Sequence, residues 1–209
     1  MTTLLLIRHG TTATTGVRLG GRTATPLNER GRAQARAAGR RIAPLAPAAV
    51  VSSPVARAQE TAELVAGELG LDVGVVDGLA EVDYGRWTDR PIARVARTAR
   101  WRVVQATPSR VTFPGGERLG GMQTRAVEEV ERLVAAHRGA CVAAVSHADV
   151  IKAVIAFYLG VPLDLFARLD VATGSVSVLR LPAGARPVLV RLNDDGPLGG
   201  GERTGTGHG

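Results

Sequence analysis

Two short apolar segments of this chain each run directly into a histidine, and this feature strongly limits the folds open to it. Residues 4–7 are followed by Arg8 and His9, and residues 141–146 are followed by His147. A short apolar run of this kind is typical of a strand that is buried on both faces, as in a parallel sheet. Ligand sites of parallel sheets lie beyond the carboxyl ends of the strands. The sequence therefore predicts a site to which both histidines contribute.

The rest of the chain repeats the order of strand and helix. Asn28 is a plausible N-cap for the first helix, and Pro54 opens the second. The alternation predicts an α/β fold, a three-layer α/β/α sandwich with a mostly parallel central sheet. The predicted elements are strands at 4–7, 49–53, 73–76 and 141–146, helices at 29–42, 54–69 and 150–159, and a terminal hairpin or edge strands at 175–181 and 187–192.

The length of 209 residues and the 45% hydrophobic content predict one globular domain, which we place at residues 1–193. Residues 194–209 are rich in glycine, and we expect a disordered tail. Residues 86–113 are polar and rich in arginine, and they lack a strand pattern. We expect this insertion, named the cap segment below, to cover the site and to select the substrate.

The net charge of +7 raises the question of nucleic-acid binding. The basic residues are almost all arginines, and we interpret them as scattered along the chain and not grouped in blocks. Aromatic residues make up only 3% of the chain. We therefore expect no nucleic-acid partner and a weak attraction for small phosphorylated anions. The sequence shows no membrane-length apolar run or signal peptide and only one cysteine, Cys141, so we expect a cytoplasmic protein.

His9 is the first candidate for chemistry, because Gly10 after it lets the backbone turn tightly and approach a ligand. A histidine in this position can be a metal ligand, a general base or a nucleophile, or can be only a satisfied strand-end side chain. No HxH, HExxH or Cys/His cluster accompanies it, so the sequence predicts no metal site.

Three further positions change the balance toward a phosphate site. Arg57 lies in the first turn of a predicted helix, where its guanidinium and the free helix amides suit an anion. His147 lies directly before another helix. Glu81 precedes a glycine turn and aromatic residues that raise a carboxyl pKa, as a general acid requires. Asp83 is the rival acid.

Six sequence blocks, taken in order, resemble the histidine phosphatase superfamily, also called the phosphoglycerate mutase-like fold, over roughly residues 3–192. Each block is weak alone, but their order and spacing make coincidence improbable. The first, third and fourth blocks are LIRHGTT at 6–12, SSxxxRAxET at 52–61 and LxExxxGxW at 79–87. The second block is made of Gly21-Arg22, Pro26-Leu27, Gly31 and Gln34-Ala35. The last two are PGGE at 114–117 and VSH at 145–147.

The resemblance implies a role for each matching residue. His9 is the nucleophile that is phosphorylated on its distal nitrogen, and Arg8, Arg57 and His147 surround the phosphoryl oxygens. Glu81 protonates the leaving oxygen and then takes a proton from the attacking water. No cofactor or metal is implied, because arginines and imidazoles supply the positive field. A homodimer is an analogy with the family.

The chain departs from the family pattern at three places. The loop reads Thr14-Thr15-Gly16 where many members have asparagine, so a phosphate contact by Thr15 or Thr12 is expected instead. Ala148-Asp149 stands where a glycine commonly follows the VSH block, which adds a carboxylate near the pocket or a helix N-cap. The cap segment does not match the long substrate-retaining segment of bisphosphoglycerate-dependent mutases, which favours hydrolysis.

The sequence thus predicts a metal-independent phosphomonoesterase that hydrolyses a small phosphorylated metabolite through phosphohistidine. Two alternatives stay open. One is a 2,3-bisphosphoglycerate-dependent phosphoglycerate mutase, which needs a bisphosphate to prime His9. The other is a non-catalytic module that binds anions, and the presence of both His9 and Glu81 argues against it.

Overall fold

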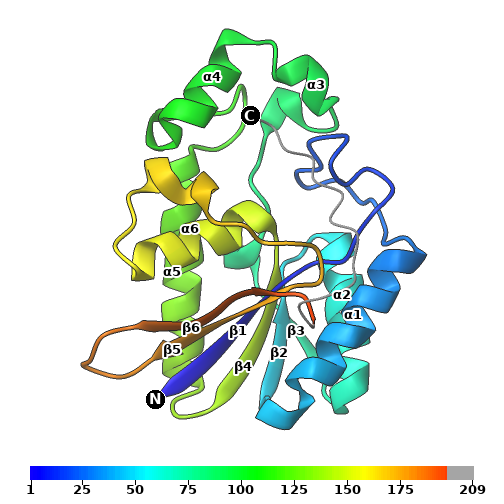
Figure 1. Ribbon diagram of the computed structural model, residues 1–209, viewed down its shortest axis with the longest axis vertical. Coiled ribbons are helices and arrows are strands. Elements are labelled where there is room, and N and C mark those ends of the chain that lie inside the picture. The colour runs from blue at the N-terminus through cyan, green and yellow to red at the C-terminus, as the bar shows by residue number, and fades with distance from the viewer. Residues whose placement is uncertain (197–209) are drawn as a thin grey trace.

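A six-stranded sheet forms the centre of the protein in the computed structural model, which describes residues 1–196 (Figure 1). The strand order is β3-β2-β4-β1-β5-β6. The first four of these strands are parallel, whereas β5 runs antiparallel to β1 and β6 antiparallel to β5. The mostly parallel sheet is therefore confirmed. The strands are β1 Thr2–Arg8, β2 Ala49–Ser52, β3 Val73–Val75, β4 Cys141–Ser146, β5 Val176–Leu181 and β6 Val188–Asp194.

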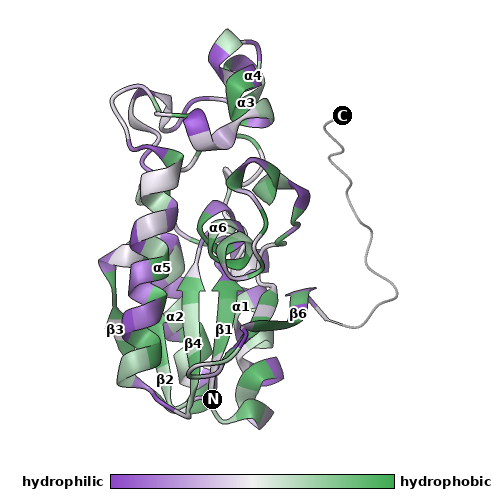
Figure 2. Cartoon of the chain, turned by 90° about the vertical axis from the view of Figure 1, so that its left-hand side faces the viewer, coloured by the Kyte–Doolittle hydropathy of each residue, from purple (hydrophilic) through white to green (hydrophobic). Residues whose placement is uncertain are grey.

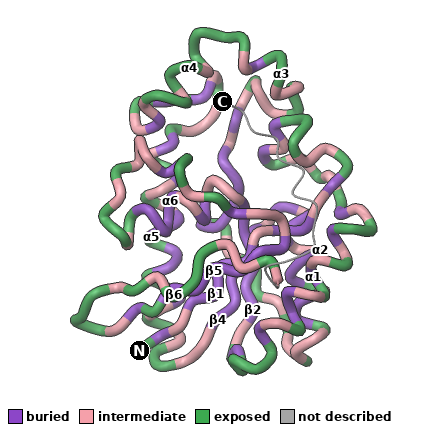
Figure 3. The backbone as a smooth tube through the Cα atoms, in the orientation of Figure 1, coloured by how far each residue is buried: buried purple, intermediate pink, exposed green. Residues whose placement is uncertain are grey.

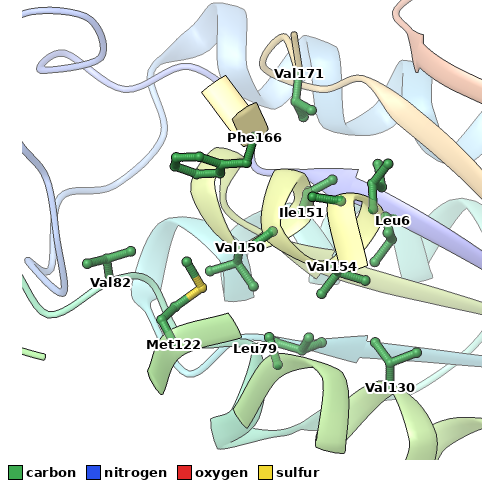
Figure 4. Close-up of a cluster of buried hydrophobic side chains, with 14 of the residues drawn as sticks. Leu6, Leu79, Val82, Met122, Val130, Val150, Ile151, Val154, Phe166 and Val171 are labelled. Carbon is green, nitrogen blue, oxygen red and sulfur yellow. The ribbon is translucent and has the colours of Figure 1, made fainter. Parts of the chain in front are cut away.

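Helices cover both faces of the sheet, which confirms the three-layer sandwich. Side chains alternate along β1, so that Leu4 and Leu6 join one hydrophobic cluster whereas Leu5 and Ile7 join the other. The first cluster includes side chains of α5 and α6 (Figure 4), and the second includes side chains of α1 and α2. Figure 2 shows the strands as a hydrophobic layer between the helices. These helices are α1 Glu29–Ile42, α2 Ala56–Leu69, α5 Leu119–Ala136 and α6 Ala148–Tyr158.

The helix starts follow local chemistry. Asn28 caps α1, as predicted, because its side chain accepts a hydrogen bond of 2.9 Å from the amide of Gly31. Helix α2 begins at Ala56 rather than at Pro54, since Pro54 lies in a bend and Val55 is the N-cap. Helix α6 begins directly after His147.

Helix α5 was not predicted, although it is the longest helix of the described residues. Its buried positions recur at the helical spacing of three or four residues. Two consecutive glycines in its first turn, Gly120 and Gly121, weaken the helical signal there. Packing against α6 and the sheet stabilises the helix despite them.

The cap segment folds into short helices beyond the carboxyl ends of the parallel strands, where most of its surface is exposed (Figures 1 and 3). Trp87, Trp101 and Phe113 hold it together, with ring centroids 6.2 Å apart for the two tryptophans and 5.8 Å apart for Trp87 and Phe113. Its helices are α3 Ile92–Val95 and α4 Ala99–Ala106, followed by the 3-10 turn η4 Pro108–Arg110. The other 3-10 turns are η1 Ala43–Leu45, η2 Asp77–Leu79, η3 Gly85–Trp87 and η5 Leu163–Arg168.

The end of the predicted domain lies close to the end of the sheet. Strand β6 continues to Asp194, one residue beyond the predicted boundary at 193, because Asp194 pairs with Val176 of β5. Residues 197–209, which make up most of the predicted disordered tail, lie outside the described residues. None of the helices within residues 1–196 combines the length and the apolar character that a bilayer crossing requires.

Candidate active site

The carboxyl ends of β1, β2 and β4 lie side by side, and the predicted site residues gather beyond them. Gly10 allows the chain to turn closely past the start of α1, where a Cβ would overlap the carbonyl oxygen of Gly31. The amide of Gly10 donates a hydrogen bond of 3.1 Å to Thr61 Oγ1 of α2. The backbone beside His9 is thus fixed between α1 and α2.

A pocket of about 280 Å³ opens at this edge. Five of the six predicted site residues line it, namely Arg8, His9, Thr15, Arg57 and Glu81. His147 has no exposed surface and lies behind the pocket wall, with its ring centroid 5.2 Å from that of His9. The structure therefore brings all six residues together.

His9 lines the pocket, and one of its imidazole nitrogens is unprotonated. Arg57 Nε donates a hydrogen bond of 3.0 Å to His9 Nε2, and a guanidinium can only donate. Nε2 therefore accepts, and His9 Nδ1 carries the proton that it donates to the carbonyl oxygen of Gly10 at 2.7 Å. Burial, and then the charges of Arg57 and Arg8, lower the pKa of His9 well below its usual value. His9 is therefore neutral, and the lone pair of its Nε2 accepts the hydrogen bond from Arg57.

Arg57 is the central cation of the site. Its Nη2 lies 2.7 Å from the carbonyl oxygen of Gly21, 3.1 Å from His147 Nδ1 and 3.6 Å from Glu81 Oε2. Burial lowers the pKa of Arg57, whereas the charge of Glu81 raises it. Its place in the first turn of α2, as predicted from the sequence, lets the side chain extend over the strand ends.

His147 supports Arg57 from behind. Its Nδ1 accepts from Arg57, so its Nε2 carries the proton and donates to Ser53 Oγ at 2.8 Å. Burial, followed by the charge of Arg57, lowers the pKa of His147 well below its usual value. In this arrangement the neutral His147 orients the guanidinium.

Glu81 is a buried carboxyl group beside this cation. Burial, and then the charge of Asp149, raise its pKa to about 7, and Arg57 lowers it only in part. Its Oε1 accepts a hydrogen bond of 2.9 Å from the amide of Val82. Arg22 Nε and Arg125 Nη2 bind its carbonyl oxygen at 3.1 Å and 3.2 Å, so the backbone at Glu81 is held on two sides.

The rival acid, Asp83, stabilises a turn instead of facing the pocket. Its Oδ1 accepts a hydrogen bond of 2.9 Å from the amide of Gly85 and thereby shapes the turn. Within residues 1–196, Asp83 is not among the residues that line the pocket. The geometry favours Glu81 over Asp83 as the proton donor.

Arg8 and Thr15 complete the predicted set. Arg8 Nη1 donates to the carbonyl oxygen of Val171 at 2.6 Å, and its buried Nε has no hydrogen-bond partner in the described part of the chain. Burial lowers the pKa of Arg8. Thr15 Oγ1 accepts from the amide of Thr12 at 2.9 Å, so Thr15 shapes the loop as well as lining the pocket.

Further residues line the pocket beside the predicted set. Asp149 accepts a hydrogen bond of 2.8 Å from the hydroxyl of Tyr84, and both line the pocket beside Glu81. The sequence offered two places for Asp149, a carboxylate near the pocket or a helix N-cap. The first is confirmed, because Asp149 lines the pocket, whereas the N-cap of α6 is His147. Ile92 and Trp101 add an apolar wall from the cap segment, and no local pattern marks these two positions.

Metal ligands do not gather in the described structure. No group of three or more histidine, cysteine, aspartate or glutamate side chains occurs there in a geometry that could hold an ion. A buried neutral imidazole, two arginines and a carboxyl group with a pKa near neutrality form instead a site suited to phosphoryl transfer.

Comparisons with known proteins agree with this class of site. The sequence model of the histidine phosphatase superfamily (branch 1) matches residues 4–195. The chain therefore belongs to the histidine phosphatase superfamily. The resemblance in the sequence is confirmed.

Individual relatives show how far the similarity extends. The chain is 35% identical over 204 residues to the bifunctional protein Rv2228c of Mycobacterium tuberculosis, covering 94% of this chain but only 55% of that protein, so it spans about half the length of this relative. It is 29% identical to phosphoserine phosphatase 1 of Hydrogenobacter thermophilus, covering 92% of each chain. The solved mycobacterial glucosyl-3-phosphoglycerate phosphatase Rv2419c superposes with a TM-score of 0.83 at 27% identity, covering 92% of this chain and 98% of that one.

Proposed function

We propose that this chain is a metal-independent phosphomonoesterase that acts on a small phosphorylated metabolite through a phosphohistidine at His9. The observation that carries the proposal is the hydrogen bond from Arg57 to His9 Nε2, because it shows that Nε2 is unprotonated and lies beside a cation that can bind the phosphoryl group. Two of the similar proteins are named as phosphatases of small metabolites, which supports this class of activity.

In the first half-reaction, the hydrogen bond from Arg57 Nε to His9 Nε2 opens and frees the lone pair of Nε2. Nε2 then attacks phosphorus while the bond from phosphorus to the ester oxygen breaks. Arg8 and Arg57 stabilise the charge on the phosphoryl oxygens, with Thr15 as a further contact. Glu81, with a pKa of about 7, gives its proton to the leaving oxygen. The carbonyl oxygen of Gly10, which accepts a hydrogen bond from His9 Nδ1, stabilises the positive charge that develops on the imidazole.

In the second half-reaction, the Glu81 carboxylate takes a proton from water while the water oxygen attacks phosphorus. The bond from phosphorus to Nε2 breaks, and neutral His9 and protonated Glu81 are restored. His147 keeps Arg57 in place throughout, and its own contact to phosphate stays a prediction. We further propose that residues 1–193 form the catalytic domain and that the cap segment selects the substrate through Ile92 and Trp101.

The test is hydrolysis of 4-nitrophenyl phosphate in the presence of a metal chelator. Wild type and His137→Ala are expected to be equally active, because His137 lies at the end of α5, before β4 begins, at the opposite end of the sheet from the pocket. His9→Ala is expected to be inactive, and rapid quenching of wild type is expected to trap an acid-labile phosphoprotein. Loss of activity with chelator, or an active His9→Ala, would refute the mechanism.

The mutase alternative makes a different prediction. It requires interconversion of 3- and 2-phosphoglycerate only when 2,3-bisphosphoglycerate is added, whereas a phosphatase releases inorganic phosphate without a primer. A homodimer, the absence of a nucleic-acid partner and a cytoplasmic location stay predictions from the sequence.

A further inference from the structure

The cap segment carries almost the whole net charge of the protein. Residues 86–113 contain seven arginines and one acid, a net charge of +6, whereas the whole chain has +7. The expectation that the basic residues are scattered is therefore wrong for the excess charge, which is concentrated in this one segment. The seven arginines are Arg86, Arg90, Arg94, Arg97, Arg100, Arg102 and Arg110.

These cap arginines are exposed and are not neutralised by the protein itself. All seven side chains are exposed, and within residues 1–196 none of them makes an ion pair or a side-chain hydrogen bond. The one cap acid, Asp89, pairs with Arg18 from outside the segment. Asp164 feels the charge of Arg110 but binds the amide of Ser109 instead.

The cap is joined directly to the pocket wall. The amide of Leu19 donates to the carbonyl oxygen of Arg90 at 3.0 Å, and the amide of Ile92 donates to the carbonyl oxygen of Val17 at 2.9 Å. Leu19, Ile92 and Trp101 line the pocket, whereas none of the seven cap arginines is among the lining residues in the described structure. The charge therefore lies on a segment that forms part of the pocket wall, while the arginine side chains themselves stay outside the lining.

We propose that the cap arginines form an electrostatic steering surface that draws phosphate esters with two or more negative charges to the pocket. This inference rests on the proposed function. Clustered charge of one sign raises the local concentration and the association rate of oppositely charged ligands. Screening limits its reach to about 10 Å at 0.1 M salt, but at 0.01 M the reach is about 30 Å and the whole cap contributes.

Steering and direct contact predict different patterns of mutational effects. A steering charge acts through its sign and distance, so the loss from each neutralised cap arginine is small and the losses add together. A direct contact would concentrate the loss in one residue. Steering also leaves kcat unchanged, because no cap arginine touches the reacting groups.

The experiment compares two triple variants that remove the same charge. Arg94→Gln/Arg97→Gln/Arg102→Gln neutralises part of the cap. Arg138→Gln/Arg180→Gln/Arg186→Gln neutralises three exposed arginines outside the cap that lack ion pairs in the described structure, near the opposite end of the sheet. Hydrolysis of 4-nitrophenyl phosphate is measured for both and for wild type at 0.01 M and 0.2 M salt, together with calorimetric binding of inorganic phosphate.

At 0.01 M salt the cap variant is expected to lose about 3- to 10-fold in kcat/KM with kcat unchanged, and the other triple variant to remain within about 2-fold of wild type. The difference is expected to shrink at 0.2 M salt.

Equal kcat/KM in the two variants, with wild-type turnover intact, would overturn the steering surface but not the proposed function. If wild type shows no turnover, the proposed function fails. The inference is then tested by phosphate binding alone: weaker binding by the cap variant than by the other triple variant supports it, and equal binding overturns it. Cap-dependent binding of an oligonucleotide with unchanged kcat/KM would also overturn it.

Discussion

Arg57 Nε lies 3.0 Å from His9 Nε2, and Nη2 of the same guanidinium lies 3.1 Å from His147 Nδ1. Because a guanidinium only donates, both imidazole nitrogens must accept, and both histidines are neutral. One side chain therefore fixes the tautomers of two histidines that lie on different strand ends. The nucleophile and its environment are prepared before a substrate enters.

Replacement of Arg57 tests this arrangement. In Arg57→Gln we expect kcat/KM to fall by about 100- to 1000-fold, because a charged donor to the phosphoryl oxygens is lost. The pKa of His9 should rise, since Arg57 is the largest charge that lowers it, and the acidic limb of the pH profile should move to higher pH. Arg138→Gln is the matched control. An unchanged acidic limb would show that Arg57 does not set the state of His9.

The sequence was sufficient for the parts of the site that depend on local pattern. The strand that ends at His9 and the helix that starts near Arg57 follow from apolar runs and helix signals, and parallel pairing then brings their ends together. The block around Glu81 has no strong local structure. Its glycine turn and aromatic residues marked Glu81 as a candidate acid, and the family resemblance implied its role. The choice between Glu81 and Asp83 needed the turn at Gly85, which is visible only in the folded structure.

Other features depend on long-range packing and were not predictable from local pattern. The tryptophans of the cap segment could be noted in the sequence, but only the folded cap shows that Trp101 reaches the pocket while Trp87 packs inside the cap. The pairing of Tyr84 with Asp149 joins residues 65 positions apart. The charge of the cap was visible in the sequence, but its lack of ion-pair partners was not.

The role of Glu81 as a proton donor can be separated from its role in packing. In Glu81→Gln we expect turnover of an alkyl phosphate such as glycerol phosphate to fall by at least about 100-fold, because the alkoxide needs a proton. Turnover of 4-nitrophenyl phosphate should fall much less, since nitrophenolate leaves unprotonated. Steady-state kinetics on both esters checks this, with Asp83→Asn as the control. Equal losses on the two esters would exclude Glu81 as the acid.

Asp149 is expected to set the pH at which Glu81 loses its proton. Its charge raises the pKa of Glu81, so Asp149→Asn should move the alkaline limb of activity from near pH 7 to lower pH. Tyr84→Phe removes the hydrogen bond from the Tyr84 hydroxyl to Asp149 but keeps the charge of Asp149, so the alkaline limb of this variant should not move to lower pH. The measurement is kcat/KM between pH 5 and pH 9 for all three proteins. A matching downward shift in both variants would point to altered packing.

The buried histidines are expected to make the protein sensitive to acid. Their pKa values are lowered in the folded state, so the unfolded chain binds protons more readily as pH falls below about 6.5. The stability that the neutral histidines contribute is present above this pH and is lost as pH falls toward their folded-state pKa values. Glu81 acts in the opposite direction. Because its pKa is raised from 4.5 to about 7 in the folded state, its stabilising contribution is lost as pH rises from about 4.5 to 7 and is regained as pH falls.

Glu81→Gln should therefore expose the effect of the histidines. Without the compensating carboxyl group, the free energy of unfolding of this variant should fall more steeply than that of wild type between pH 7 and pH 5, because Glu81 no longer takes up a proton in the folded state. Urea unfolding at several pH values measures both slopes. Glu131→Gln serves as the control, since Glu131 is exposed. A variant slope equal to that of wild type would mean that Glu81 does not hold a proton in the folded protein at pH 5 to 7.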